Sequence, residues 1–307
     1  MNIVSLLPSS SEILGVLDLM DSVVAVSHEC DFPVEVEGKP RITSSIIPHG
    51  LEARAIDAAV VTAVREGRPL YEVNGDLLGR LSPDLIVTQG VCDVCAVGVG
   101  TLQETLKLLP DVVSPSVETL SLTGTTVAGV FRDILRVAQA AEVPERGAAV
   151  VQRLQRRWDA LEATPKQANP KVLVLEWSDP PFSAGHWVPE MVAAAGGTDV
   201  LGAPGAVSRR LTWAEILRAD PDLVVMAACG YGGGQNAVFA RDLYAHPDAR
   251  RLRAVRDGQV YAVDANAYFS RPGPRVVAGA ELLARLFAGR ATPEDAVRVA
   301  PVAVQNS

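Results

Sequence analysis

The chain of 307 residues has no excess of positive charge, and this limits its partners. It carries 28 Lys and Arg against 36 Asp and Glu, a formal net charge of −8 at pH 7. Nucleic acids and anionic membranes are bound through an excess of Lys and Arg. The basic run Arg250, Arg251, Arg253 and Arg256 is interpreted as solvated surface. The composition therefore predicts neither nucleic acid nor an anionic membrane as the main partner.

Long apolar runs are missing as well. None approaches the ~18 residues of a membrane span, so no membrane insertion is expected. The N-terminus does not read as a signal peptide, because no basic region follows Met1 and the apolar residues 3–7 are interrupted by Pro8 and three serines. As written, the sequence predicts a cytoplasmic protein, or a periplasmic or cell-surface one if an export segment was removed.

Cysteine is scarce, which excludes a disulfide scaffold in a chain of this length and makes reduced thiols the default. The four cysteines are Cys30, Cys92, Cys95 and Cys229. Cys92-x-x-Cys95, with His28 and Cys30 as a second pair, would suggest zinc, but the His-x-Cys spacing is poor for zinc. A dithiol redox role is also considered, although Asp93 would raise the pKa of both thiols. We interpret the cysteines as small apolar groups that line a loop.

Motifs for nucleotide binding and nucleophilic hydrolysis are absent. No Gly-x-Gly-x-x-Gly follows an expected strand, no Gly-Lys-Ser/Thr follows the glycines at 232–234, and no Gly-x-Ser-x-Gly is present. Asp84 and Asp222 resemble a catalytic carboxylate pair, but each directly follows a proline, and turn formation explains both. We therefore expect the protein not to be an enzyme.

Two stretches of the chain share one design. Residues 81–95 contain a Pro-Asp turn, an apolar run at 85–87 and a loop, and residues 218–230 repeat the turn and the run at 223–225. Such a run is typical of a buried strand. Because open α/β sheets bind ligands beyond the carboxyl ends of their strands, both loops are predicted to border a ligand site.

The length and the repeated pattern predict two α/β lobes of Rossmann-like type. Strands are expected at 2–7, 23–26, 85–87 and 111–113, and again at 171–176, 223–225 and 260–263. A helix from 144 to about 161 precedes the polar segment 164–170, the best domain boundary. The predicted domains are an N-terminal lobe (1–143), a linker helix (144–164), a C-terminal lobe (165–289) and a loosely attached tail (290–307).

Local signals predict further features. Ser9 with Glu12 and Thr212 with Glu215 have the spacing of capping boxes, which start helices. Other helices are expected at 51–66, 76–81, 101–109, 125–141 and 276–286, whereas 40–50 is expected to be irregular. His49 and His246, each beside a proline, are expected at the surface.

Aromatic residues form only 5% of the chain, yet they gather in the strand-end loops. They are Phe32 and Tyr71 in the first half, and Trp177, Phe182, Trp187, Tyr231, Tyr268 and Phe269 in the second. Flat apolar walls with a few polar groups suit a large planar ligand. Individual rings can equally belong to the core.

The chain resembles the substrate-binding proteins of cobalamin and iron-chelate importers. The matching segments are Ile3-Val4-Ser5-Leu6, Pro8-Ser9, Glu12-Ile13-Leu14, Val24-x-Val26-Ser27, Cys30-Asp31-Phe32-Pro33, Pro83-Asp84-Leu85-Ile86, Pro181-Phe182-x-Ala184-Gly185, Ala195-Gly196-Gly197, Pro221-Asp222-Leu223, Val260-Tyr261-x-Val263-Asp264 and Arg271-Pro272-Gly273-Pro274-Arg275. The resemblance implies two lobes joined by one long helix, with a ligand cleft between them. The loop Gln89-x-x-Cys92-x-x-Cys95-Ala96 is similar to the branch labelled cobalamin-binding.

The ligand that this resemblance implies is cobalamin or a related corrinoid, with no catalytic cofactor. The predicted ligand-binding residues are Phe32, Gln89, Cys92, Cys95, Trp177, Phe182, Trp187, Tyr231, Tyr268 and Phe269. The apolar faces of the corrin suit the aromatic rings, and its rim amides suit Gln89 and backbone groups. The candidate axial ligands of cobalt are His28, His186 and Cys92.

The implied partner is an ABC importer, with the protein as a monomer. Members that dock to importers carry an exposed acidic residue on each lobe; Glu52 serves on the first, but Ser270 stands at the second position. We therefore expect corrinoid binding for ABC-type uptake or for intracellular carriage. The alternatives are a haem- or siderophore-type chelate, or a thiol-based zinc or redox protein that uses Cys92 and Cys95.

Overall fold

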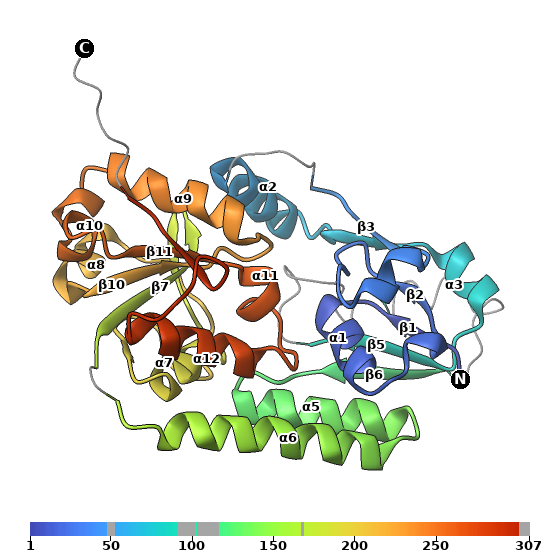
Figure 1. The fold of residues 1–307 in the computed structure, drawn as a ribbon. Helices are drawn as coiled ribbons and strands as arrows, with labels where there is room; N and C mark the ends of the chain where they lie inside the picture. Colours follow the sequence, from blue (N-terminus) through green and yellow to red (C-terminus); the bar gives the residue numbers. More distant parts are fainter. Residues whose placement is uncertain (48–52, 91–101, 103–116, 167–168, 301–307) are drawn as a thin grey trace. The chain divides into compact units, whose positions relative to one another are not determined.

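The computed structural model describes residues 1–47, 53–90, 102, 117–166 and 169–300. The chain forms two compact units (Figure 1). The first lobe comprises Met1–Gly124 and Ala128–Leu154, and the second comprises Thr125–Val127 and Gln155–Ser307. The predicted two-lobe α/β class is confirmed. The cleft predicted between the lobes stays a prediction.

The first lobe is built on a four-stranded parallel sheet in the order β2-β1-β5-β6 (Figure 1). The strands are β1 (Ile3–Ser5), β2 (Val23–Val26), β5 (Leu85–Gln89) and β6 (Glu118–Leu122). Every residue of β5 is buried, which explains its continuous apolar run, because a strand inside a parallel sheet is covered on both faces. The sequence did not predict β6, since its Glu, Thr and Ser residues interrupt the apolar pattern.

A two-stranded antiparallel ribbon adds to this lobe where the sequence predicted irregular structure. It consists of β3 (Thr43–Ser45) and β4 (Tyr71–Val73), with Thr43 opposite Val73. Ile42 N–H donates to Val26 O at 2.9 Å, which ties the start of the ribbon to β2. The expectation for 40–50 was wrong over β3, because a Thr-Ser-Ser strand carries no apolar pattern and is defined by its pairing partner.

Before β5, the first lobe contains three α-helices that the sequence predicted, one of them with a corrected start, and two short 3-10 helices that it did not predict. They are α1 (Pro8–Val16), η1 (Met20–Ser22), η2 (Val34–Gly38), α2 (Ala53–Arg65) and α3 (Gly75–Leu81). The prediction of a capping box at Ser9 was wrong. α1 begins at Pro8, its N-cap is Leu7, and no side chain caps it. Proline suits the first helical position, where its missing N–H costs no hydrogen bond. Ser9 is therefore inside the helix.

The second lobe contains a six-stranded sheet in the order β12-β11-β10-β7-β8, with β9 also paired to β7. The strands are β7 (Lys171–Ser178), β8 (Pro181–Ser183), β9 (Thr198–Asp199), β10 (Leu223–Met226), β11 (Val260–Val263) and β12 (Ala296–Arg298). β8 and β12 are antiparallel to their neighbours. The expectation of a loose tail was wrong for β12, because it pairs with β11 and covers an edge that would otherwise be open.

α5 (Val127–Ala140) belongs to the first lobe apart from its first residue. Eight further helices within the described residues lie in the second lobe or lead into it. They are α6 (Pro144–Ala163), α7 (Val188–Ala194), α8 (Trp213–Ala219), α9 (Gly233–Ala245), η3 (Ala249–Arg251), α10 (Arg253–Arg256), α11 (Ala265–Tyr268) and α12 (Val276–Phe287). α6 begins in the first lobe and ends in the second. The capping box at Thr212 is confirmed, since Glu215 N–H donates to its Oγ1 and Thr212 N–H donates to Glu215 Oε2.

The repeated Pro-Asp turns have one structural role in both lobes. Asp84 Oδ2 accepts a hydrogen bond from Asn2 N–H at 2.6 Å, and Asp222 Oδ2 accepts one from Lys171 N–H at 2.7 Å. Each carboxylate thus fixes the chain just before the central strand beside it, β1 or β7. Both aspartates thus have a structural role that links their turns to the start of a neighbouring strand.

The two sheets also share their topology. In the first lobe β1 lies between β2 and β5, and in the second β7 lies between β9 and β10, all in parallel. The chain therefore leaves each central strand toward one side and returns on the other. Such a switch point opens a crevice at the carboxyl ends of the strands, where α/β sheets bind ligands.

Candidate functional site

Hydroxyl groups are buried at the carboxyl end of β1. Ser5 Oγ contacts Ser10 Oγ and lies 2.8 Å from Ser11 Oγ, and Ser11 Oγ donates to Cys30 Sγ at 3.2 Å. All four residues are at most 2% exposed. The thiol of Cys30 is therefore part of a serine network that joins α1 to the loop after β2.

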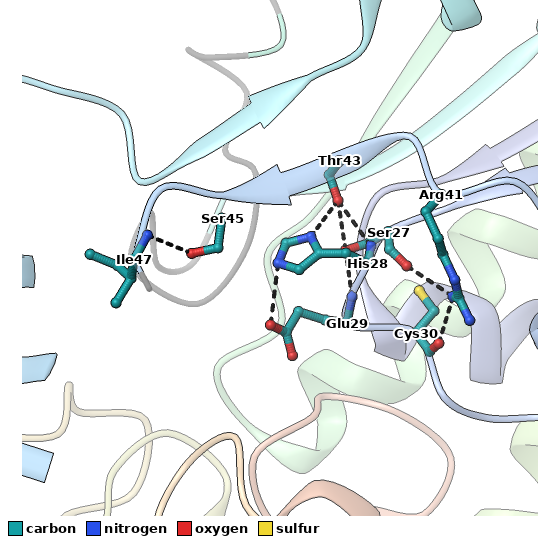
Figure 2. Close-up of polar contacts among 8 residues, drawn as sticks. All are labelled: Ser27, His28, Glu29, Cys30, Arg41, Thr43, Ser45 and Ile47. Atoms are coloured by element: carbon teal, nitrogen blue, oxygen red, sulfur yellow. Dashed lines mark hydrogen bonds and ion pairs between the residues drawn. The ribbon is translucent and has the colours of Figure 1, made fainter. Parts of the chain in front are cut away.

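The loop after β2 places His28 against the ribbon (Figure 2). Thr43 Oγ1 lies 2.7 Å from His28 Nδ1 and accepts a hydrogen bond from His28 N–H at 3.0 Å. His28 Nε2 lies 3.3 Å from Glu29 Oε1, and its ring lies 5.6 Å from that of Tyr71. Arg41 Nη1 donates to the backbone carbonyls of Ser27 and Cys30, at 3.1 and 2.6 Å. The ribbon that the sequence did not predict thus fixes the geometry of this loop.

Three aromatic rings pack together at the carboxyl ends of β7 and β10 in the second lobe. The ring of Trp177 lies 5.9 Å from that of Tyr231 and 6.3 Å from that of Phe239, and Tyr231 meets Phe239 edge-on at 5.0 Å. Trp177 and Tyr231 were predicted site residues. Phe239 was missed because it lies within α9, five residues beyond the last glycine of the glycine-rich loop.

Trp177 carries an unsatisfied hydrogen-bond donor. Its Nε1 is buried and has no acceptor among the described residues. A buried donor without a partner costs ~1–3 kcal/mol. Trp177 as a whole is only partly buried.

Asn236 holds the turn that carries Tyr231. It is completely buried; its Oδ1 accepts from Ala228 N–H at 2.8 Å, and its Nδ2 donates to Tyr231 O at 3.1 Å and Val263 O at 3.0 Å. One side chain therefore links the ends of β10 and β11 to the turn between β10 and α9. The sequence offered no signal for this role, since Asn236 follows a glycine-rich segment that reads as an ordinary loop.

His186 lies in a strained loop before α7. Its φ is +54°, a left-handed conformation that costs energy for any residue with a side chain. The backbone is held by bonds from His186 N–H to Ala206 O and from Gly205 N–H to His186 O. Burial lowers the pKa of His186, because desolvation disfavours the charged imidazolium. Its ring nitrogens make no hydrogen bond within the described part of the chain, so a neutral imidazole remains available to a metal.

Glu176 secures the same loop from β7. Its Oε1 accepts a hydrogen bond from Gly185 N–H at 3.2 Å, and its Oε2 accepts one from Ser208 Oγ. A side chain at Gly185 would meet Ser208 N at 2.4 Å, so this close approach requires glycine. Glu176 thereby fixes the position of His186 next to Gly185.

Two of the predicted ligand-binding residues are core residues of the second lobe. Trp187 is 5% exposed and Phe269 is 2% exposed. Trp187 Nε1 donates to Phe269 O at 2.9 Å, so its polar group is already satisfied within the lobe. Both side chains are occupied by packing, and we leave them out of the proposed site.

The other predicted residues differ in accessibility. Phe32 is 43% exposed, and Gln89, the last residue of β5, is 5% exposed. Phe182 is partly buried, with the Arg210 guanidinium 5.6 Å from its ring centre, and Tyr268 is partly buried at the end of α11. Cys92 and Cys95 lie outside the described residues, as do Glu52, His49 and the segments predicted at 111–113 and, apart from Leu102, at 101–109. His246 is partly buried and stacks on Trp213, with ring centres 4.2 Å apart.

A family model described as Periplasmic binding protein matches residues 3–267 of the chain. The chain belongs to this family. A comparison with curated proteins gives no match. Members of the family are solute-binding proteins that work with ABC importers outside the cytoplasm, and they are not enzymes. No helix in the described segments is long and apolar enough to cross a membrane.

Solved structures share the fold over nearly the whole chain. The periplasmic heme-binding protein RhuT from Roseiflexus sp. RS-1 is 22% identical, with 95% of this chain and 99% of that chain covered and a TM-score of 0.68. The periplasmic vitamin B12 binding protein BtuF of Vibrio cholerae is 19% identical, with 94% and 97% covered and a TM-score of 0.62. A possible iron-binding protein from Staphylococcus epidermidis ATCC 12228 is 19% identical, with 93% and 97% covered and a TM-score of 0.68. At these identities the likeness establishes the fold and leaves the ligand open.

Proposed function

We propose that the protein is a non-enzymatic carrier of a corrinoid of the cobalamin class, and that it delivers this ligand to an ABC importer. The observation that carries the proposal is the aromatic wall of Trp177 and Tyr231 at the carboxyl ends of β7 and β10. The flat rings suit the apolar face of a macrocycle. Phe182 and Tyr268 offer further partly buried rings in the same lobe.

The charges of the strand-end loops favour a corrinoid over haem. Glu29, Asp31 and Asp179 are all exposed in these loops. A haem carries two propionates, which these carboxylates would repel, whereas most of the corrin rim consists of neutral amides. Arg41 already donates to two backbone carbonyls.

His186 is our choice among the predicted axial ligands of the metal. Its lowered pKa keeps the imidazole neutral at pH 7, the form that coordinates metals. His28 is less suitable, because Nδ1 is bonded to Thr43 and Nε2 faces Glu29. Replacement of His186 with alanine should change the visible spectrum of bound cobinamide. The same spectrum with wild-type protein and the variant would exclude coordination by His186.

The proposal is tested by calorimetry with cobalamin, cobinamide and haemin side by side. We expect one corrinoid per chain at micromolar concentration or below, and weaker binding of haemin. Tight binding of haemin alone would replace the corrinoid with haem as the ligand, and no binding of any of the three would refute the proposal. Trp177→Ala should weaken corrinoid binding by about tenfold, because the apolar wall loses its largest ring. Trp213→Ala is the matched control, since Trp213 stacks on His246 instead.

The thiol alternative has less support. Cys30 is engaged by Ser11, and no group of three or more His, Cys, Asp or Glu residues with metal-site geometry occurs in the described part of the chain. Because Cys92 and Cys95 lie outside that part, a zinc or redox role for them stays a prediction. Stoichiometric zinc in freshly purified protein would support it.

A further inference from the structure

The backbone carbonyl of Tyr231 joins two segments of the second lobe. It accepts hydrogen bonds from Ala265 N–H at 3.1 Å and Asn266 N–H at 3.3 Å, in addition to the bond from Asn236 Nδ2 at 3.1 Å. Ala265 and Asn266 are the first two residues of α11. The turn that carries one ring of the aromatic wall is therefore fixed to the start of α11.

Asp264 holds the first turn of α11. It is the N-cap residue, and its Oδ1 accepts a hydrogen bond from Ala267 N–H at 2.8 Å. The Cβ of a side chain at Gly232 would lie 3.6 Å from Asp264 Oδ2, so the carboxylate lies beside the turn that follows Tyr231. α11 has only four residues, too few to be stable without a cap and tertiary contacts. Its position therefore depends on Asp264.

The other end of α11 is held against α12. α11 ends at Tyr268, and the Cβ of a side chain at Gly279 of α12 would meet the carbonyl oxygen of Tyr268 at 2.8 Å. This close approach of the two backbones requires glycine. The short helix thus connects Tyr231 at its start to Tyr268 at its end, and both residues are partly buried.

We propose that Asp264 is a positioning residue of the corrinoid site, an inference that rests on the proposed function. Its cap fixes α11, and α11 fixes the Tyr231 ring through the carbonyl that its first residues bind. The ring then keeps its place 5.9 Å from Trp177 and 5.0 Å from Phe239. A wall that is already in its binding geometry binds more tightly, because no free energy is spent on ordering it.

The test is calorimetry with cobalamin on wild-type protein and three variants. Asp264→Ala should weaken binding by about fivefold, because loss of the N-cap acceptor loosens α11 before the ligand binds. Asp264→Asn should bind as wild type does, since asparagine caps a helix as well as aspartate. Asn74→Ala is the matched control: Asn74 Oδ1 accepts from Leu77 N–H at 2.9 Å and caps α3 of the first lobe, so its loss should leave binding unchanged.

A double-mutant cycle separates positioning from a general loss of stability. Tyr231→Ala removes the ring but keeps the carbonyl that binds α11. If Asp264 acts through that ring, Asp264→Ala should cause little further loss of affinity in the Tyr231→Ala background. Additive losses would overturn the inference. So would wild-type affinity in Asp264→Ala, an equal loss in Asn74→Ala, or weak binding by Asp264→Asn.

The outcomes also distinguish this inference from the proposed function. If wild-type protein binds cobalamin and the Asp264 variants behave otherwise than expected, the positioning role alone is wrong. If wild-type protein binds no corrinoid, the proposed function is wrong and the positioning role with it. Should Asp264→Ala fail to fold, Asp264→Gly takes its place with an expected loss of about twofold, because glycine tolerates the N-cap backbone but has no acceptor.

Discussion

Asn236 gives the sharpest test of how the second-lobe site is held. Replacement of Asn236 with aspartate keeps the shape of the side chain and keeps an acceptor for Ala228 N–H. It replaces Nδ2, which donates at 3.1 and 3.0 Å to the carbonyls of Tyr231 and Val263, with a carboxylate oxygen. Two hydrogen bonds would become two repulsive contacts between oxygens. The site is completely buried, so water cannot relieve them.

The expected loss in the free energy of unfolding is about 3 to 5 kcal/mol at pH 7, from the two lost bonds and the buried charge. Burial and the facing carbonyls should raise the pKa of the introduced carboxyl above its unfolded value. The destabilisation is then fully present above that raised pKa and decreases as the pH falls through it. A protonated carboxyl donates one bond again, so the loss should shrink to about 1 to 2 kcal/mol at acidic pH.

Tryptophan fluorescence during urea unfolding is the suitable assay. The four tryptophans, Trp158, Trp177, Trp187 and Trp213, all belong to the second lobe, so the signal reports that lobe alone. Gln235→Glu is the control, because the neighbouring Gln235 is exposed and gains the same charge. The reasoning is refuted if Asn236→Asp and Gln235→Glu unfold at the same urea concentration at pH 7, or if their difference does not decrease toward acidic pH.

Two further predictions concern buried oxygen atoms without partners. Ser9→Ala should stabilise the protein by about 1 kcal/mol, because Ser9 Oγ is buried without a hydrogen bond among the described residues; Ser10→Ala should instead destabilise it, since Ser10 Oγ donates to Leu7 O at 2.9 Å. Calorimetry would contradict this if both variants moved the melting temperature in the same direction. Asp199→Asn should also stabilise the protein at pH 7, because burial raises the pKa of Asp199 and makes its charge unfavourable. This gain should shrink as the pH falls through the raised pKa, and a gain independent of pH would rule out the explanation.

Much of the architecture follows from local patterns in the sequence. The apolar runs at 85–87 and 223–225 predicted two buried strands, and the Pro-Asp turns before them predicted the repeat that the two lobes share. The capping box at Thr212 was correct because both of its hydrogen bonds form within four residues. The box at Ser9 failed because Pro8 started the helix earlier.

The candidate site was only partly predictable. The clustering of aromatic residues in the loops pointed to Trp177 and Tyr231. It could not show that Trp187, which has the same kind of side chain, is instead buried in the hydrophobic core. Burial depends on which elements cover a residue, and that is decided by packing over long sequence distances.

The sequence by itself determined the class of fold, the repeated strand-and-turn design and the aromatic loops, because these depend on residues close together in the chain. Only the tertiary structure decided the ribbon that brings Thr43 to His28, the contact between Asn236 and Val263, and the return of β12 to the sheet. Each joins residues that are 15 to 37 positions apart in the sequence. These contacts form because buried polar groups need hydrogen-bond partners. Which groups are buried is decided only when the sheets have formed, so the contacts cannot be inferred from the local sequence.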